Sequence, residues 1–471
     1  MPLDARTLEW LWFDRAARDE RVREVVADVL AEHPPPVLDD SITASYFVAG
    51  RSLTLEAAAD SYTYHATSGV KNPPAGSLLA ACTSKTVGVV PFDATGRMGL
   101  VHLAFPLKMM QHPDGTLTSL DILHTVAGPI MFDVYESLDC RLVGLRMPDH
   151  VIRTFPGPAY GPRGLRQMTG FAADQPAFGT ILKPTAGITP DVVGRLVEQA
   201  ARCPLFMFVK EDENLYPDLD YSPAADRVRQ AMAVIERAGS ERGPLGIIFA
   251  PHVSGAPHQI MNTVLAVLEA GARAVMFSET FAGGAVRMVR EKTKHLANPP
   301  AIYGHNAGIG TRTPHIWREV IDLLARLEGI DFRQTAPVRP GTPFLLPYGQ
   351  EWTASEEVLS RPLPGIEPTM IVRAGGLDQG NIILNLMNVE HRGLTEGVLF
   401  LAGSAINSIK NAAGEPDPRL GAAAMMEAID VHRSGELADA PIEEHLRALI
   451  AVAQRRNLKA LREALRQRYT V

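Results

Sequence analysis

The sequence of 471 residues has few cysteines, no block of basic residues and no long apolar run. Its three cysteines, Cys82, Cys140 and Cys203, are widely spaced, which excludes a disulfide framework or a zinc pattern and suits a reducing cytoplasm. With a net charge of -7 and no basic cluster, nucleic-acid binding is disfavoured. No run reaches the length of a membrane span, and the N-terminal stretch lacks the apolar core of a signal peptide. We therefore expect a cytoplasmic protein that binds neither nucleic acid nor membrane.

The composition is that of a globular protein long enough for two domains. Apolar residues make up 46% and charged residues 21% of the chain. Residues 1–36 predict a helical extension, because apolar side chains recur at helical spacing before a proline-rich stop. We interpret this extension as a packing or oligomer-contact segment.

Residues 37–155 predict a small α+β domain. Four segments have the alternation of strands and two have helical spacing, an order typical of a ferredoxin-like sandwich. The predicted strands are 42–48, 86–90, 98–105 and 140–147, and the predicted helices are 53–60 and 117–127.

Residues 156–440 contain eight strand-like segments that alternate with helical ones. This rhythm over about 250 residues predicts a (β/α)8 TIM barrel. A doubly wound sheet is the alternative, but the first turn lacks the glycine-rich fingerprint that such sheets normally carry. The tail, 441–471, predicts helices that cover the barrel. The predicted barrel strands are 178–183, 205–210, 245–250, 272–278, 301–305, 330–335, 369–374 and 398–403.

The second predicted barrel strand ends in a cluster of charges, Lys210, Asp212 and Glu213. Barrels keep their chemistry at the carboxyl ends of the strands. Unpaired buried charges are costly, so the cluster is either a salt-bridged strand end or the holder of a divalent cation. Carboxylate oxygens are ligands that Mg²⁺ takes. A lysine ammonium would repel the ion unless it pairs, loses its proton or is modified into an anion.

Other predicted strands also end in side chains with chemical potential. Lys183 ends the first strand, as a surface charge or as a functional amine. His252 follows the third strand and is at least equally a structural histidine, whereas the glycine before His305 lets that imidazole point into the mouth. After the seventh and eighth strands, glycine-rich turns are either phosphate sites or merely tight turns. These turns contain Ala374, Gly375, Gly376, Gly403 and Ser404.

The pattern Lys210-x-Asp212-Glu213 after an apolar strand resembles the metal-binding segment of the RuBisCO large-subunit superfamily. In that family, CO2 carbamylates the lysine, and the carbamate and both carboxylates bind Mg²⁺. The resemblance, which runs from about residue 40 to about residue 428, implies the same roles here. It also implies that Lys183 transfers protons and that His305 lies near the metal and the substrate hydroxyls.

Weaker parts of the resemblance concern three further positions. Asp60 matches a glutamate that the family's N-terminal domain lends to the neighbouring subunit, which implies a homodimer with shared active sites. Gln334 stands where the family has a histidine, and Asn306 stands where RuBisCO has a phosphate-binding arginine. No small subunit is expected.

Departures from the family pattern concern the handling of CO2. Thr185 replaces the second lysine of Lys-Pro-Lys, and Pro129 replaces an asparagine needed for carboxylation. No lysine lies between Asp331 and Lys410, where RuBisCO's mobile loop carries one, and the proline-rich run 337–347 predicts a different lid. The chain therefore looks like a RuBisCO-like protein of the form IV type and not like a true carboxylase.

The expected activity is Mg²⁺-dependent enolisation of a phosphorylated keto-sugar or keto-sugar acid through a metal-bound enediolate, with decarboxylation or tautomerisation as the outcome. Arg333, Arg339 and Arg373 can bind a substrate carboxylate bidentately, which favours a sugar acid. The alternatives are a non-catalytic sugar-phosphate-binding protein and a true ribulose-bisphosphate carboxylase.

Overall fold

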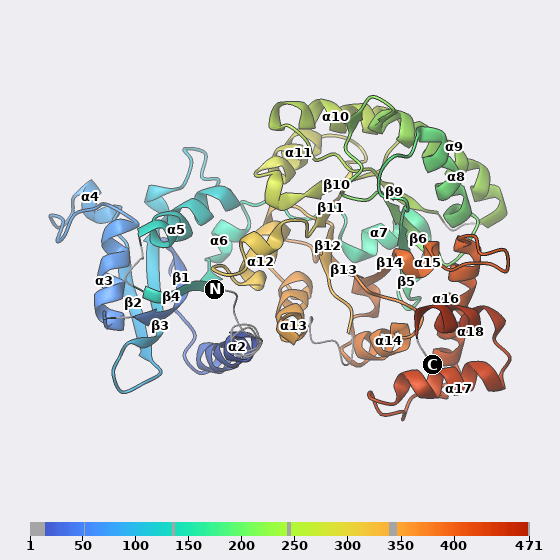
Figure 1. Ribbon diagram of the computed structural model, residues 1–471. Coiled ribbons are helices and arrows are strands. Elements are labelled where there is room, and N and C mark those ends of the chain that lie inside the picture. Colours follow the sequence, from blue (N-terminus) through green and yellow to red (C-terminus); the bar gives the residue numbers. More distant parts are fainter. Residues whose placement is uncertain (1–14, 51, 134–136, 243–245, 339–345, 470–471) are drawn as a thin grey trace, which may run out of the picture.

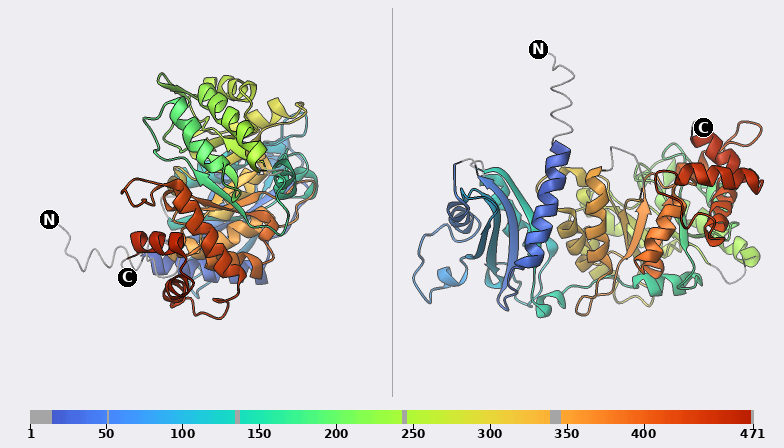
Figure 2. Two further views of the ribbon diagram at one scale, coloured as in Figure 1. Left: turned by 90° about the vertical axis from the view of Figure 1, so that its right-hand side faces the viewer. Right: turned by 90° about the horizontal axis from the view of Figure 1, so that it is seen from below.

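The computed structural model of the chain describes residues 15–50, 52–133, 137–242, 246–338 and 346–469 (Figure 1). They form a small N-terminal domain and a barrel that lie side by side, with the last helices at the end of the barrel away from the N-terminal domain (Figures 1 and 2).

The N-terminal domain is an antiparallel sheet covered by helices. Its elements are β1 (Ser41–Gly50), α3 (Leu55–His65), α4 (Leu78–Ala81), β2 (Lys85–Pro91), β3 (Met98–Pro106), α5 (Ser119–Asp133) and β4 (Ser137–Arg146). The sheet order is β2-β3-β1-β4. Alternate residues of β1, such as Tyr46 and Val48, pack with Leu55 of α3 and Ile122 of α5 on one face. This arrangement confirms the predicted ferredoxin-like sandwich.

A further helix, α2 (Arg15–Glu32), covers the second face of this sheet. Its Val26 is fully buried in a cluster with Phe47 of β1. The Arg23 guanidinium lies 4.1 Å from the ring centroid of Trp317, at the start of a barrel helix. The predicted helical extension therefore contacts both the sheet and the barrel.

The barrel consists of eight parallel strands. They are β5 (Ala177–Ile181), β6 (Phe206–Lys210), β9 (Ile248–Ala250), β10 (Ala274–Ser278), β11 (Ala301–His305), β12 (Phe332–Thr335), β13 (Met370–Ala374) and β14 (Val398–Ala402). They pair in the order β10-β11-β12-β13-β14-β5-β6-β9. Just beyond β9, the Val253 N–H donates to the Met276 carbonyl of β10 over 3.0 Å, which brings the two end strands together. The predicted TIM barrel is confirmed and the doubly wound alternative is excluded.

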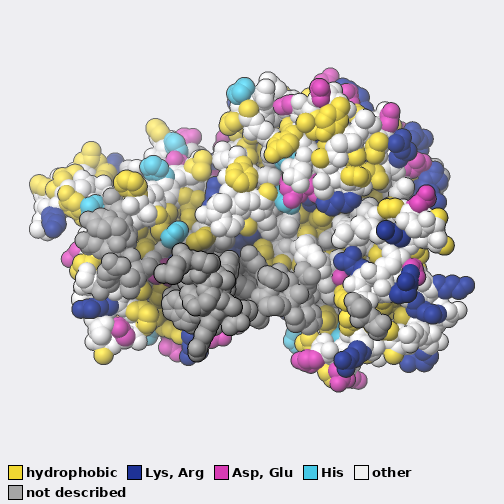
Figure 3. Space-filling view, viewed as in Figure 1, with side chains coloured by type: hydrophobic (Ala, Val, Ile, Leu, Met, Phe, Trp, Pro, Cys, Tyr) yellow, Lys and Arg dark blue, Asp and Glu magenta, His cyan; other side chains and the backbone are white. Residues whose placement is uncertain are grey.

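Helices surround the barrel and extend it at one end. The surrounding helices are α8 (Pro190–Ala201), α9 (Ala224–Arg242), α10 (Pro257–Glu269), α11 (Ala285–Thr293), α12 (Arg318–Glu328), α13 (Leu346–Ser360), α14 (Ile382–His391) and α16 (Pro418–Arg433). The tail forms α17 (His445–Arg455) and α18 (Lys459–Arg468). Leu461 and Leu465 of α18 are buried in the barrel's outer core. Lysine and arginine side chains are more numerous on the barrel end of the face in Figure 3 than on the N-terminal domain. Among the described helices, none has the length and apolar character to cross a membrane.

Candidate active site

A bulge between Phe206 and Phe208, followed by regular alternation from Phe208 onward, determines which side chains of β6 enter the barrel. Met207 and Phe208 belong to the core inside the barrel, whereas Phe206 and Val209 pack against the surrounding helices. Lys210 also points inward, because its Nζ lies 5.6 Å from the ring centroid of the inner residue Tyr303. The next residues continue this alternation beyond the end of the strand.

Glu211 points outward, to helix α9. Its carboxylate accepts two bonds from Arg227, Nε to Oε1 at 2.6 Å and Nη2 to Oε2 at 2.8 Å. It also accepts the His252 main-chain N–H at 2.9 Å. Both side chains of the ion pair are fully buried. This pair fixes the backbone between Lys210 and Asp212, so Glu211 supports the site from behind.

Lys210 is fully buried and its Nζ donates to the Glu211 main-chain oxygen over 2.9 Å. Burial lowers the pKa of the Lys210 amine to about 8, and the carboxylates of Glu213 and Asp212 oppose that shift. At pH 7 a pKa of about 8 leaves about a tenth of the amine unprotonated, which is the form that reacts with CO2 and is far scarcer for an ordinary lysine. The environment therefore suits the carbamylation implied by the resemblance.

Asp212 and Lys183 meet across the ends of β6 and β5. The Lys183 Nζ lies 2.6 Å from Asp212 Oδ2, and Asn214 donates its main-chain and side-chain N–H to Oδ1 at 3.2 and 3.1 Å. Although burial opposes it, the bonds from Lys183 and Asn214 lower the pKa of the Asp212 carboxyl. Asp212 is therefore an anion held at the mouth of the barrel.

Glu213 and His305 form a second contact across the mouth. The His305 Nε2 lies 3.3 Å from Glu213 Oε2, while Nδ1 accepts the Ala307 main-chain N–H at 3.1 Å. That bond to Nδ1 assigns the proton of the neutral ring to Nε2. Burial, and then the charge of Lys210, hold the pKa of His305 well below its usual range. His305 is thus a neutral ring whose N–H faces the carboxylate.

His252 lies beside this cluster and is almost fully buried. Its Nδ1 lies 3.2 Å from the Leu215 carbonyl and its Nε2 lies 3.5 Å from the Ser278 hydroxyl. Burial lowers the pKa of His252 to about 4. These contacts favour a neutral histidine that connects the ends of β9 and β10, consistent with a structural role.

The residues around Lys210 fit the implied magnesium site. In the part of the chain that the structure describes, no group of three or more histidine, cysteine, aspartate or glutamate side chains is placed to hold a metal. Asp212 and Glu213 supply two carboxylates, and a carbamate on Lys210 would supply a third anionic oxygen group. Hard oxygen donors are the ligands that Mg²⁺ takes. The donor set is therefore complete only if the lysine is modified.

The two glycine turns lie on the β13 and β14 side of the mouth. Gly375 and Gly376 have positive φ values of 85° and 90°, a conformation that favours glycine, and the space beside Gly375 is open. At Gly403, an added Cβ would lie 3.7 Å from the Lys183 Cε. The Asn407 amide donates to the Ile181 and Gly403 carbonyls at 2.9 and 3.0 Å. Lys183 therefore lies between the carboxylates and the second turn, whose next residue, Ser404, is exposed.

Arg333 and Arg373 do not face the mouth, which corrects their assignment to a substrate carboxylate. They occupy outward positions of β12 and β13, next to inward Phe332 and Val372. Arg333 bonds Asp322 at 2.6 Å and also Glu279, and Arg373 bonds Glu356 at 2.9 Å through both Nε and Nη2. Both arginines are almost fully buried, so their charges already have protein partners. Arg339 and most of the predicted lid lie outside the described residues.

Three further residues line the inside of the barrel near the mouth: Tyr303, Asn306 and Gln334. Sequence reasoning supported Asn306 and Gln334 only weakly and Tyr303 not at all. The Tyr303 hydroxyl donates to Gln334 Oε1 at 3.0 Å, and Asn306 donates to the Gln334 carbonyl at 2.9 Å. The Arg318 guanidinium bonds Asn306 Oδ1 at 2.7 Å. Tyr303 was missed as a site residue, although its position two residues before His305 on β11 places it on the same face.

Asp60 is exposed on α3 of the N-terminal domain, which lies away from the barrel mouth of the same chain (Figure 1). A role in the site would therefore require a second subunit, as the resemblance implies.

Comparisons with known proteins agree with this architecture. Residues 165–342 match the family described as ribulose bisphosphate carboxylase large chain, catalytic domain. Over these residues the chain resembles the catalytic domain of the RuBisCO large-chain family. A 3-oxo-isoapionate-4-phosphate transcarboxylase/hydrolase of Xanthobacter autotrophicus is 31% identical over 45% of this chain and 50% of its own length, so only half of that relative is matched. A ribulose bisphosphate carboxylase of Thermococcus onnurineus is 26% identical over 74% of this chain and 76% of its own.

Solved structures show the same fold over nearly the whole chain. The octameric RuBisCO of Pyrococcus horikoshii, crystallised with sulfate, has a TM-score of 0.74 at 22% identity and covers 92% of this chain and 94% of its own. A RuBisCO-like protein of Alicyclobacillus acidocaldarius has a TM-score of 0.72 at 24% identity and covers 91% and 99%. The predicted fold is therefore confirmed.

Proposed function

We propose that this RuBisCO-like protein is a Mg²⁺-dependent enzyme that decarboxylates a phosphorylated 3-oxo sugar acid by way of an enediolate. The observation that carries the proposal is the grouping of Lys183, Lys210, Asp212, Glu213 and His305 at the inner mouth of the barrel. Two relatives from Rhizobium species are named 3-oxo-isoapionate-4-phosphate decarboxylases, at 29% and 26% identity, which favours decarboxylation over tautomerisation.

The bound ion would be held by the Lys210 carbamate, Asp212 and Glu213, and would act as a Lewis acid that stabilises negative charge developing on the substrate oxygens. Loss of CO2 from a 3-oxo acid leaves the bonding electrons on the adjacent carbon, which then needs a proton. Lys183 is the candidate donor, because its amine lies between the carboxylates and the Gly403 turn and is about one third exposed.

His305 is suited to hold a substrate hydroxyl. Its Nε2–H is a neutral donor, and its pKa stays well below its usual range because the ring is buried. A neutral donor binds an oxygen without adding a second cation beside the metal site. The glycine turns at 375–376 and 403–404 provide main-chain N–H groups for the phosphate at the other end of the substrate.

The departures at Thr185 and Pro129 support an activity other than carboxylation. We further propose a homodimer without a small subunit, in which Asp60 of one chain approaches the barrel mouth of the other. Dimeric and octameric assembly are stated for the archaeal RuBisCO structures of Hyperthermus butylicus and Pyrococcus horikoshii.

The test is proton NMR in D2O with Mg²⁺, bicarbonate and a panel of phosphorylated 3-oxo sugar acids and keto-sugars. Decarboxylation with deuterium at the adjacent carbon is expected for a sugar acid. Exchange in a keto-sugar without CO2 release would favour tautomerisation instead. Absence of turnover across the panel, combined with saturable binding of a phosphorylated compound, would favour the sugar-phosphate-binding alternative.

A matched pair of variants tests the metal site. Asp212→Asn should reduce turnover at least about 100-fold and abolish stabilisation by Mg²⁺, which for the wild type should reach about 2.7 kcal/mol at a concentration 100 times the Kd. Asp218→Asn, on the exposed strand β7 (Asp218–Leu219), is the control and should change neither. Equal Mg²⁺-induced shifts in melting temperature for both variants would contradict the metal assignment.

A further inference from the structure

The end of helix α18 bonds to two separate loops at the mouth of the barrel. Three consecutive residues, Gln467, Arg468 and Tyr469, take part. Gln467 contacts the segment that follows β14, and the next two residues contact the segment that follows β13. These are the two segments that begin with the glycine turns.

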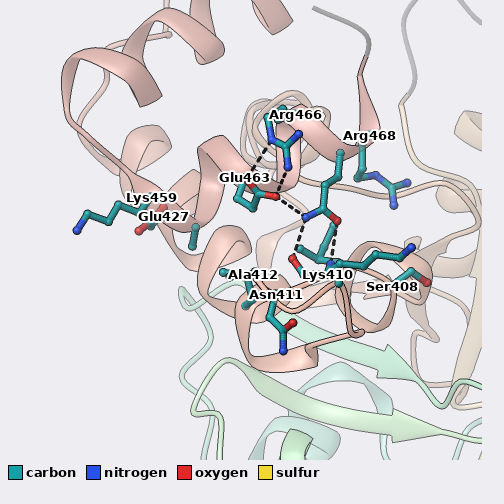
Figure 4. A pocket seen from close by; sticks show the side chains of 14 residues that line it. Ser408, Lys410, Asn411, Ala412, Glu427, Lys459, Glu463, Arg466 and Arg468 are labelled. Carbon is teal, nitrogen blue, oxygen red and sulfur yellow. Dashed lines mark hydrogen bonds and ion pairs between the residues drawn. The ribbon is translucent and has the colours of Figure 1, made fainter.

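Gln467 makes a reciprocal pair of bonds with the backbone of Lys410 (Figure 4). Its Nε2 donates to the Lys410 carbonyl at 2.8 Å, and its Oε1 accepts the Lys410 N–H at 2.8 Å. Glu463 orients the amide, because its Oε1 accepts from the same Nε2 at 2.6 Å. Lys410 follows the short helix α15 (Ser404–Asn407), which starts directly after Gly403. Gln467 therefore bonds the backbone just beyond the end of α15 that lies away from the second turn.

Arg468 and Tyr469 both contact the Asp378 carboxylate. The Tyr469 hydroxyl donates to Oδ1 at 2.7 Å, and the Arg468 Nε lies 3.3 Å from Oδ2. The tyrosine ring lies against Gly380, where an added Cβ would be 2.4 Å from the hydroxyl oxygen. Any larger side chain at position 380 would displace the ring.

Asp378 connects Tyr469 to the first glycine turn through further hydrogen bonds. Its Oδ1 also accepts the Gly380 and Asn381 N–H groups at 2.9 and 3.2 Å. The Asn381 side chain in turn donates to the Gly376 carbonyl at 2.8 Å. The path from Tyr469 to the turn thus runs through Asp378 and Asn381, all by hydrogen bonds within the described residues.

A cavity lies beside these bonds. A cavity of about 1010 Å³ lies between the 408–414 loop, α16 and α18, and Gln467 and Arg468 line it (Figure 4). Ile409, next to Lys410, packs with Ala460 and Ala464 of α18, so this apolar contact and the polar bonds of Gln467 together set the separation of the loop and the helix.

We propose that Gln467, Arg468 and Tyr469 are positioning residues that hold the two glycine turns at the spacing needed to bind one phosphate group. This inference rests on the proposed function, because it assumes that both turns contact the phosphate. Each turn alone offers only a few N–H groups, so a small change in their separation weakens binding without affecting the carboxylates near Lys210.

Two measurements on the full-length protein test the inference. The first is hydrogen–deuterium exchange of the peptide that contains residues 375–381, and it requires no ligand. Tyr469→Phe removes the donor to Asp378 and should accelerate exchange of this peptide. The second is calorimetric titration with inorganic phosphate, for which Tyr469→Phe and Gln467→Ala should each raise the Kd about 3- to 10-fold. In steady-state assays with a substrate that the enzyme converts, both variants should have a higher KM than the wild type and a kcat within about 2-fold of it.

The control is Arg462→Ala, on the same helix, whose guanidinium bonds Asn457 at 3.1 Å and not the loops. It should change neither measurement. Unchanged exchange in Tyr469→Phe would overturn the inference even if the enzyme proves active. If Tyr469→Phe exchanges faster but the wild type binds no phosphate, the inference is also overturned. The glycine turns then form no phosphate site, and that part of the proposed function fails with it. Faster exchange together with weaker phosphate binding would support it.

Discussion

Replacement of Arg227 by alanine removes the cation from the buried ion pair behind the candidate metal site. The Glu211 carboxylate would lose two bonds, of 2.6 and 2.8 Å, and keep only the His252 N–H at 2.9 Å. Breaking a buried pair of this kind costs about 3–5 kcal/mol, because the remaining charge stays desolvated. A Coulomb estimate agrees, since opposite charges about 4 Å apart at an effective dielectric constant near 20 attract by about 4 kcal/mol.

The assay is urea denaturation followed by tryptophan fluorescence and circular dichroism, with the slope of the transition checked for constancy. The control is Arg229→Ala on the same helix, because Arg229 is 62% exposed and pairs with Asp226. That variant should lose less than about 1 kcal/mol. The double replacement Glu211→Met and Arg227→Met should recover most of the loss. If Arg227→Ala destabilises no more than Arg229→Ala, the buried-pair reasoning is refuted.

Val26→Ala on α2 should lower the free energy of unfolding by about 2 kcal/mol, because it removes buried apolar surface. The control Val37→Ala, at an exposed site, should leave that free energy unchanged. Equal urea midpoints for the two variants would contradict the packing role of α2. Burial lowers the pKa of His102 to about 4, so below pH 6.5 the unfolded chain binds a proton that the folded chain does not, and stability falls as the pH decreases from 6.5 to 4. His102→Gln should flatten this decline in acid titrations of the urea midpoint, and an unchanged slope would argue against it. Arg373→Ala should lower the melting temperature, because it breaks the buried ion pair with Glu356. The KM of the folded fraction should stay within about 2-fold of the wild type. A KM increase of about 10-fold or more would show that Arg373 binds the substrate after all.

The strands, the barrel and the charged end of β6 were predictable because they depend on local order along the chain. Apolar runs separated by helical patterns specify alternating strands and helices, and chemistry in such barrels follows the carboxyl ends of strands. Lys183, Lys210 and His305 were found in this way. The same local rule could have corrected the arginines, because Arg333 and Arg373 each follow an inward apolar residue by one position.

Contacts between distant segments were not predictable in the same way. No feature of the sequence pairs Glu211 with Arg227 rather than with Lys210, or directs Tyr469 to Asp378, which is 91 positions away. The side-chain period of a strand is local, but the neighbour that each outward residue meets depends on how the helices pack.

The sequence by itself therefore determined the resemblance to the RuBisCO large-chain family, the order of strands and helices, and the residue types at each strand end. Only the tertiary structure decided which of those residues face one another. The physical reason is closure of the barrel: it brings the ends of β5, β6 and β11 to one mouth, so that Lys183 meets Asp212 and His305 meets Glu213. It also packs helices against the outward side chains of the strands, where buried arginines need carboxylate partners.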